Sequence, residues 1–182
     1  PADTLLLDLE DAVAPDAKLT AREAIVSAVK QGGYGHREIV IRMNGLNTEW
    51  GEDDLKAAVA CGAKAVLAPK VESAADIMTL DAALTEAGAP NDFGLWVMIE
   101  MPKAILRVEE IAAASEDTRL TTFVMGTNDL AKEYRARMTP DRIAFQTALQ
   151  LSIAAARAYG LYAIDGVFND IKDEDGLINE CE

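Results

Sequence analysis

The sequence has few of the residues that histidine, thiol and zinc chemistry require. It contains one histidine, His36, and two cysteines, Cys61 and Cys181, among 182 residues. His36 lies in a glycine-rich segment away from the end of every predicted strand, which argues against zinc-hydrolase, catalytic-triad and histidine-based aldolase mechanisms. The cysteines are isolated and form no CxxC motif, so we expect a reducing compartment and core or surface positions for both.

Basic charge and long hydrophobic runs are also scarce. The formal net charge is -14, the pI is near 4.4, and no local basic patch is visible, so we expect no nucleic-acid partner. No apolar stretch approaches the ~18 residues that would cross a membrane, so we expect no membrane partner. We therefore predict a cytoplasmic protein.

What the sequence does have is a series of short apolar runs, each ending in charged residues. Such runs, with helical sequence between them, are typical of parallel strands buried on both faces. Ligands and catalytic groups gather at the carboxyl ends of these strands, so the pattern predicts an enzyme. The strands are predicted at about Thr4 to Asp8, Glu38 to Arg42, Ala65 to Ala68, Leu95 to Ile99, Thr121 to Met125 and Leu161 to Ile164.

Helices are predicted between these strands, and no linker or second composition interrupts them. We therefore expect a single α/β domain over residues 1–182. An eight-unit barrel typically needs ~250 residues, so a barrel of this length lacks about one βα unit at each end. Its two open edges would favour oligomerisation, whereas a monomeric closed domain would favour an open doubly wound sheet. The predicted helices begin near Pro15 and run over Glu52 to Ala60, Ser73 to Glu86, Pro102 to Ala114, Leu130 to Tyr134, and from Thr139-Pro140 to Ala158.

Glu100 and Asp129 are the best candidate metal ligands. Each follows one of two consecutive strands, and neighbouring strands lie ~4.8 Å apart, so both carboxylates can reach one ion. Oxygen-only ligands favour a hard cation such as Mg²⁺, which commonly takes one or two carboxylates and completes its octahedron with water and substrate. The alternative is that Asp129 is only an acid favoured by the dipole at a helix start.

Arg42 ends an apolar strand, and Asp8 and Glu10 form an acidic cluster at the end of the preceding strand. One interpretation is a structural salt bridge between Arg42 and one of these acids. The other is an anion or enolate clamp, because a guanidinium stays charged and donates a fork of hydrogen bonds. Lys70 completes the set of cations at the strand ends.

Several motifs, taken together and in order, resemble the citrate lyase beta-chain-like family of CoA-ester lyases, within the HpcH/HpaI aldolase/citrate lyase superfamily. The resemblance covers essentially the whole chain. The motifs are DLEDAV (8–13) with Lys18 and Arg22, IRMN (41–44) with Trp50 and DDL (53–55), PKVES (69–73), IE (99–100), GTNDL (126–130), and AIDGV (163–167) with Asp170.

The resemblance implies a TIM (β/α)8 barrel whose Mg²⁺ is held by Glu100 and Asp129. It implies a substrate that is the acyl-CoA ester of a hydroxy dicarboxylic or tricarboxylic acid, so that CoA enters as part of the substrate. Catalysis would fall to Arg42, which would stabilise a thioester enolate, and to Asp8 and Glu10, which would orient Arg42 or relay a proton. Arg42, Glu100 and Asp165 would contact the substrate.

The resemblance also leaves the reaction and the assembly to be decided. The leading prediction is cleavage or formation of a carbon-carbon bond in citryl-, malyl- or citramalyl-CoA by a homo-oligomer, trimeric or hexameric. The alternatives are a malyl-CoA-type thioesterase using the same site and a non-catalytic subunit of a lyase complex. Two family features are absent from the sequence: the usual first strand with its CoA-contacting basic residues, and the C-terminal strand and lid.

Overall fold

The computed structural model describes residues 2–181 and contains one sheet of six parallel strands. Each strand pairs with the strand that precedes it in the chain, in the order β1-β2-β3-β4-β5-β6. A doubly wound sheet would reverse this order at a switch point. The sequential order therefore contradicts the doubly wound alternative for the described residues. The strands are β1 Thr4–Asp8, β2 Glu38–Arg42, β3 Ala65–Ala68, β4 Gly94–Ile99, β5 Leu120–Met125 and β6 Tyr162–Ile164.

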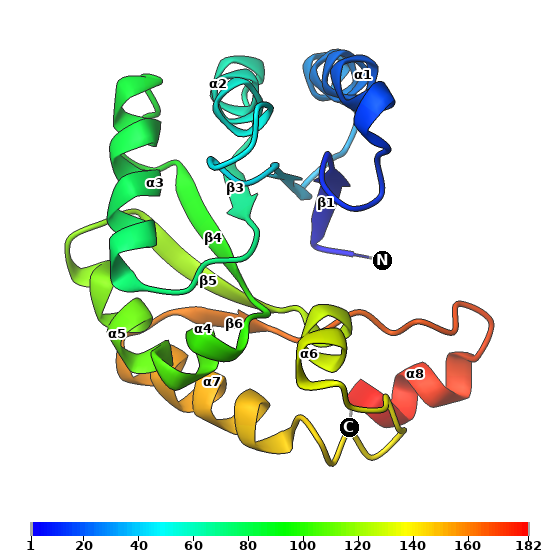
Figure 1. Ribbon diagram of the computed structural model, residues 1–182. Coiled ribbons are helices and arrows are strands. Elements are labelled where there is room, and N and C mark those ends of the chain that lie inside the picture. The colour runs from blue at the N-terminus through cyan, green and yellow to red at the C-terminus, as the bar shows by residue number, and fades with distance from the viewer. Residues whose placement is uncertain (1, 182) are drawn as a thin grey trace.

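The sheet curls into a half-barrel, with the major helices outside the arc (Figure 1). This architecture is consistent with part of a TIM-like barrel. The α-helices are α1 Lys18–Gln31, α2 Gly51–Cys61, α3 Ala74–Glu86, α4 Pro102–Leu106, α5 Val108–Ala113, α6 Thr127–Tyr134, α7 Gln146–Ala158 and α8 Glu174–Cys181, and two short 3₁₀ helices are η1 Pro15–Ala17 and η2 Ala114–Glu116. Among the helices of residues 2–181, none is both long enough and apolar enough to cross a membrane.

Side chains of successive strand residues alternate between two apolar clusters. Val66 packs in the larger cluster with residues of the helices, whereas its neighbour Leu67 packs with Trp96 and Met98 in a smaller one. This period of two is what a strand buried on both faces produces. Burial falls at the first and last strands, where Leu6 is 45% and Tyr162 is 71% exposed.

Two helix predictions are corrected by the structure. The helix predicted from Pro102 to Ala114 is broken at Arg107, whose φ of -124° and ψ of 18° are not helical, so that α4 and α5 are separate. The helix predicted from Thr139-Pro140 begins only at Gln146. Arg142 has a left-handed conformation, with φ of 48°, so a right-handed helix cannot run through it from Thr139.

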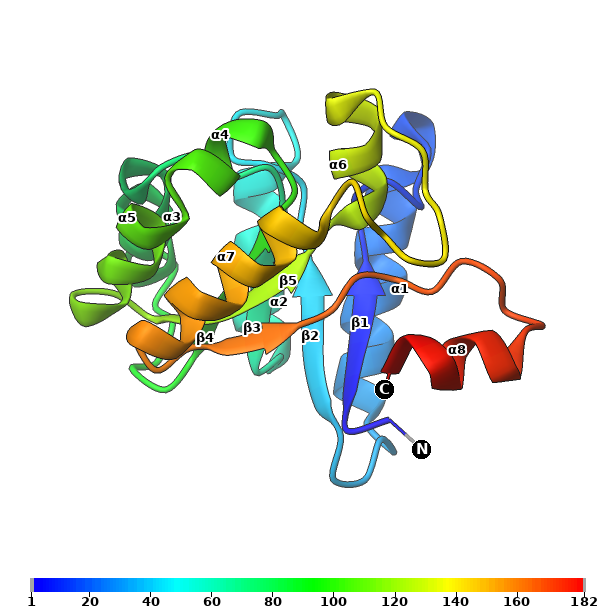
Figure 2. The ribbon, with the colours of Figure 1, turned by 90° about the horizontal axis from the view of Figure 1, so that it is seen from below.

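All six strands run the same way, so their carboxyl ends lie at one rim of the sheet. Figure 2 shows β1 and β2 pointing toward the side of the molecule at which α4 and α6 lie. His36 lies just before β2, where its Nε2 atom is 3.6 Å from Asp3. Its predicted separation from the carboxyl rim is therefore confirmed.

Candidate active site

Asp8 and Arg42 end two adjacent strands and face each other. They are register partners at the ends of β1 and β2. The guanidinium of Arg42 donates from Nε to Asp8 Oδ1 at 2.7 Å and from Nη2 to Asp8 Oδ2 at 2.5 Å. Burial raises the pKa of Asp8, but the hydrogen bond from Arg42 and those from two backbone N–H groups outweigh burial and lower it below its ordinary value. The two-point contact fixes the plane of the guanidinium.

Glu10 lies between two cations. It is 7% exposed, its Oε2 atom is 3.3 Å from Arg42 Nη1, and its Oε1 atom forms an ion pair with Lys70. Asp11 lies 3.7 Å from the same ammonium group. Burial lowers the pKa of Lys70, but the hydrogen bond and charge of Glu10 outweigh burial and raise it. The charged groups at the ends of β1, β2 and β3 therefore form one continuous network.

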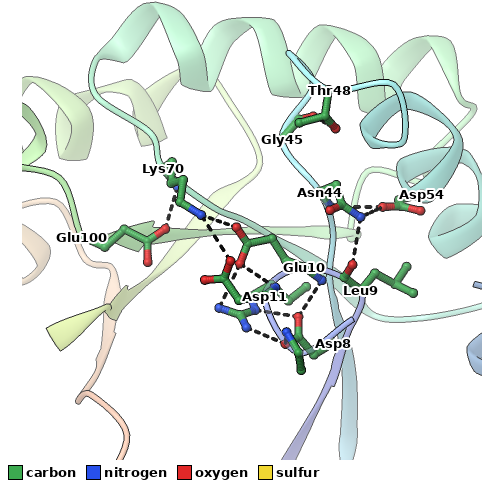
Figure 3. A network of polar contacts seen from close by, with 12 residues as sticks. Asp8, Leu9, Glu10, Asp11, Asn44, Gly45, Thr48, Asp54, Lys70 and Glu100 are labelled. Atoms are coloured by element: carbon green, nitrogen blue, oxygen red, sulfur yellow. Dashed lines mark hydrogen bonds and ion pairs between the residues drawn. The ribbon is translucent and has the colours of Figure 1, made fainter. Parts of the chain in front are cut away.

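Lys70 joins this network to Glu100 through its backbone (Figure 3). Its φ is 54°, a left-handed conformation that is uncommon for a residue other than glycine. The backbone N–H of Lys70 donates to Glu100 Oε1 at 2.8 Å. One residue thus holds Glu10 with its side chain and Glu100 with its main chain.

Glu100 is buried, and one of its carboxylate oxygens is unpaired. The residue is 1% exposed, and Oε2 has no hydrogen-bond partner among residues 2–181. Burial, opposed by the Lys70 N–H and reinforced by the charge of Asp129, raises the pKa of Glu100 to about 7. A buried carboxylate oxygen without a partner is costly, so this atom is suited to bind an external cation or to hold a proton.

Gly126, which follows β5, leaves the space that Glu100 occupies. A Cβ atom at Gly126 would lie 2.4 Å from Glu100 Cβ and 2.5 Å from Glu100 Oε2. Three positions further along, in the first turn of α6, Asp129 is close enough for its charge to affect Glu100. Across the described residues no three carboxylate, histidine or cysteine side chains form a metal cluster. Two carboxylates suit Mg²⁺, which keeps several waters and binds through one or two protein carboxylates plus substrate.

The site opens into a cavity of ≈520 Å³. Asp8, Arg42, Asp129 and Asp165 all line it, so the structure brings together side chains from β1, β2, α6 and the segment after β6. The carboxylate of Asp165 is half-exposed and accepts two hydrogen bonds from Arg142 Nη1, at 2.8 and 2.9 Å. Of the other two residues predicted for the site, Glu10 lines a second cavity of ≈520 Å³ together with Lys70, and Glu100 is buried and lines neither cavity.

Sequence reasoning missed two residues that shape this site. Lys70 was recognised as a cation at a strand end, but its backbone contact with Glu100 was not predicted, because a lysine gives no sign of a left-handed conformation. Gly126 lay inside the GTNDL motif without a role. A glycine directly after a buried strand is a sequence signal for close approach of another group, and it could have been used.

These features define a class of protein: an α/β half-barrel of parallel strands with an acidic site at its carboxyl rim, where one buried carboxylate oxygen has no partner among residues 2–181. The chain belongs to the HpcH/HpaI aldolase/citrate lyase family, whose sequence model matches residues 1–182. The resemblance recognised in the sequence is therefore confirmed.

Individual relatives bear out the assignment. The chain is 48% identical over 181 residues to a (3S)-malyl-CoA thioesterase of Cereibacter sphaeroides (strain ATCC 17025 / ATH 2.4.3), covering 100% of this chain and 60% of the relative. It is 36% identical over 186 residues to the citrate lyase subunit beta of Escherichia coli (strain K12), covering 100% and 61%. The chain thus spans about 60% of the length of these curated relatives.

A solved structure matches the fold as well as the sequence. It is the citrate lyase beta subunit of M. tuberculosis complexed with oxaloacetate and magnesium. The TM-score is 0.80 and the identity 30%, with 98% of this chain and 75% of that chain covered.

Proposed function

We propose that this chain carries the active site of a magnesium-dependent carbon-carbon lyase acting on a β-hydroxyacyl-CoA such as citryl-, malyl- or citramalyl-CoA. One observation carries the proposal: Glu100, a buried carboxylate with an unpaired oxygen, lies close to Asp129, and Asp129 lines the same cavity as Arg42. An oxygen site for a hard cation and a fixed guanidinium are the two groups needed to bind a hydroxy acid and to stabilise an enolate.

Glu100 and Asp129 are the residues that would hold Mg²⁺. When bound, the ion would supply Lewis-acid polarisation of a substrate oxygen and a template for its carboxylate. The relative from M. tuberculosis was solved with magnesium and oxaloacetate, which supports the same ligand chemistry here.

Arg42 would stabilise the negative charge that develops when the bond beside the thioester breaks. Its guanidinium is held on two edges, by the bidentate contact with Asp8 and by Glu10 at 3.3 Å. Fixed donors contribute most to catalysis when they need no reorganisation during the reaction. The salt bridge and the clamp, weighed as alternatives for Arg42, are thus compatible: the carboxylates orient the group that would contact the substrate.

Glu10 and Asp165 would act at the edges of the reacting centre. Glu10 contacts both Arg42 and Lys70, so it is placed to pass a proton between the substrate side and the second cavity. Asp165 would contact substrate from the segment after β6, with Arg142 holding its carboxylate.

Thioester hydrolysis is the second candidate function, and a specific observation favours it. The relatives named malyl-CoA thioesterase are 47–48% identical to this chain, against 36% for the citrate lyase subunit beta of E. coli. The same cavity and the same Mg²⁺ ligands would serve, with water attacking the thioester carbonyl.

Incubation of the full-length protein with Mg²⁺ and malyl-CoA separates the candidates. Glyoxylate plus acetyl-CoA, identified by mass spectrometry, is the product of a lyase, whereas malate plus free CoA is the product of a thioesterase. A panel of hydroxyacyl-CoA esters then identifies the acyl group. Binding without turnover of any ester would favour the third alternative, a non-catalytic subunit. The same preparation tests the predicted trimer or hexamer by light scattering.

A further inference from the structure

Lys18 is a buried cation that the proposed chemistry does not use. It is the first residue of α1, it is 6% exposed, and none of the described carboxylates forms an ion pair with it. Its ammonium group donates to the backbone carbonyls of Leu9 and Glu10, each at 2.7 Å, and lies 5.3 Å from the ring centroid of Trp50. Burying an ammonium group is expensive, and an apolar residue of similar volume often stabilises a core equally well. Its position here therefore calls for an explanation.

The two carbonyls that Lys18 binds lie on either side of one residue. The Leu9 carbonyl precedes the Cα atom of Glu10 and the Glu10 carbonyl follows it, so a single ammonium group fixes both peptide planes that flank Glu10. The direction of the Glu10 side chain depends on those two planes. The Glu10 side chain must point toward the ends of the next two strands to contact Arg42, at the end of β2, and Lys70, just after β3.

A second buried donor reaches the same carbonyl from another element. Asn44 Nδ2, in the segment after β2, donates to the Leu9 carbonyl at 2.9 Å (Figure 3). Asn44 is itself held by Asp54, whose Oδ2 accepts from Asn44 Nδ2 at 2.6 Å and from its backbone N–H at 3.0 Å. Arg22 Nε donates to the other oxygen of Asp54 at 2.6 Å. Lys18 at the start of α1 and Asn44 after β2 therefore both donate to the Leu9 carbonyl.

We propose that Lys18 is a positioning residue of the active site, which together with Asn44 holds the Leu9–Glu10 backbone so that Glu10 reaches Arg42 and Lys70. The role of Glu10 in turnover rests on the proposed function, whereas the backbone contacts do not. The inference also accounts for motif residues that lie outside the cavity at Arg42, namely Lys18, Arg22, Asn44 and Asp54.

The test is Lys18→Met in the full-length protein, with Lys56→Met as the matched control. Met keeps an apolar stem and removes the donors. Lys56 is exposed and, among residues 2–181, its one ion pair is with Glu52 on its own helix, so its replacement changes the same charge away from the site. Hydrogen exchange measured by mass spectrometry should become faster in residues 9–13 of Lys18→Met and should be unchanged in the control. The amide N–H groups of Glu10, Asp11, Ala12 and Val13 all donate within this loop.

Measurement of kcat distinguishes a role of Lys18 in positioning Glu10 from a role in the general stability of the fold. Displacement of Glu10 should lower kcat on the order of 10- to 100-fold, because small misplacements of catalytic groups have effects of this size. KM and the Mg²⁺ affinity measured by calorimetry should stay at the wild-type values, since the metal ligands are not touched. Asn44→Ala, which removes one of the two donors to Leu9, should show the same changes to a smaller extent, and it replaces Lys18→Met if that variant does not fold.

Unchanged exchange at residues 9–13 in a folded Lys18→Met protein would overturn the proposal, whatever its activity. Faster exchange with wild-type kcat would overturn the positioning role as well. If the wild-type protein turns over no ester, the proposed function fails, and the exchange and Mg²⁺ measurements still decide whether Lys18 holds this loop.

Discussion

At the ends of β1 and β2 every carboxylate of the site has a cationic partner, whereas at the end of β4 the buried Glu100 has an oxygen with no partner among residues 2–181. Asp8 has a lowered pKa because hydrogen bonds outweigh its burial, and Glu100 has a raised pKa because its burial dominates. The two regions lie at the same rim and use the same functional group, a carboxylate. Their difference lies in the partners that the fold supplies.

The described residues satisfy the Asp8 carboxylate, whereas they leave one oxygen of the Glu100 carboxylate without a hydrogen-bond partner. The bidentate contact fixes the Asp8–Arg42 pair, so its geometry would need no reorganisation in the proposed reaction. An unsatisfied buried oxygen such as Glu100 Oε2 costs about 1–3 kcal/mol, which an incoming cation would offset. The four predictions that follow test this contrast.

The largest effect is expected for Glu100→Gln, and for Asp129→Asn. Each change preserves side-chain volume and removes one negative charge that the cation requires. Mg²⁺-dependent activity should fall by more than the 10- to 100-fold that is typical of outer-shell partners, while circular dichroism shows an intact fold. Glu72→Gln, which alters a carboxylate paired with Lys103, is the control. Wild-type activity and Mg²⁺ affinity in either variant would contradict the metal assignment.

Arg42→Lys tests the carboxylates that have a cationic partner, at the ends of β1 and β2. Lysine keeps the charge but loses the planar fork that Asp8 holds, so kcat should fall by about 100- to 1000-fold, as for loss of one oxyanion donor, with a smaller change in substrate affinity. Steady-state kinetics with a malyl-CoA-type ester measure both. A residue with only a structural role would give a lower melting temperature and unchanged turnover per folded molecule.

Gly126→Ala tests whether the unpaired oxygen needs its space. The added methyl group would lie 2.5 Å from Glu100 Oε2 and must displace that carboxylate. Mg²⁺ affinity should fall by on the order of tenfold, the lower end of the range for groups that orient ligands. Gly94→Ala is the matched control, because its methyl group would lie 3.0 Å from Ala65 at the other end of the sheet. Equal losses of affinity in the two variants would show that the effect is not local.

The smallest effect is a pH dependence of the metal-free protein. The pKa of Glu100 is about 7 in the folded state against an ordinary value of 4.5. As the pH rises through this interval, the unfolded chain loses the proton first. The free energy of unfolding should therefore decrease from about pH 4.5 to about pH 7 and level off above it.

Glu100→Gln removes this dependence, and denaturant titrations of both proteins over the interval isolate it. Mg²⁺ competes with the same proton, so its affinity should weaken about tenfold per pH unit below the pKa of Glu100. A wild-type stability curve that parallels that of Glu100→Gln would contradict the raised pKa.

The strands, and the closeness of Glu100 to Asp129, were predictable because each follows from the position of apolar runs in the sequence. β1, β2 and β3 have the predicted bounds, since a buried parallel strand leaves a continuous apolar run in the sequence. Glu100 and Asp129 were paired from their places after consecutive strands, and the influence of Asp129 on the pKa of Glu100 agrees with that placement. The break at Arg107 was not predictable, because the apolar periodicity continues across it.

The sequence by itself determined the buried parallel strands, the rim at which the charged side chains gather, and the residue types that meet there. Only the tertiary structure decided which carboxylate oxygen stays unpaired, that Lys70 adopts a left-handed conformation toward Glu100, and that Asn44 reaches Leu9. The apolar periodicity of a strand arises from residues that are neighbours in the sequence. Partners such as Asn44 and Leu9 are separated by 35 positions, and only the packing of whole elements brings them within hydrogen-bonding distance.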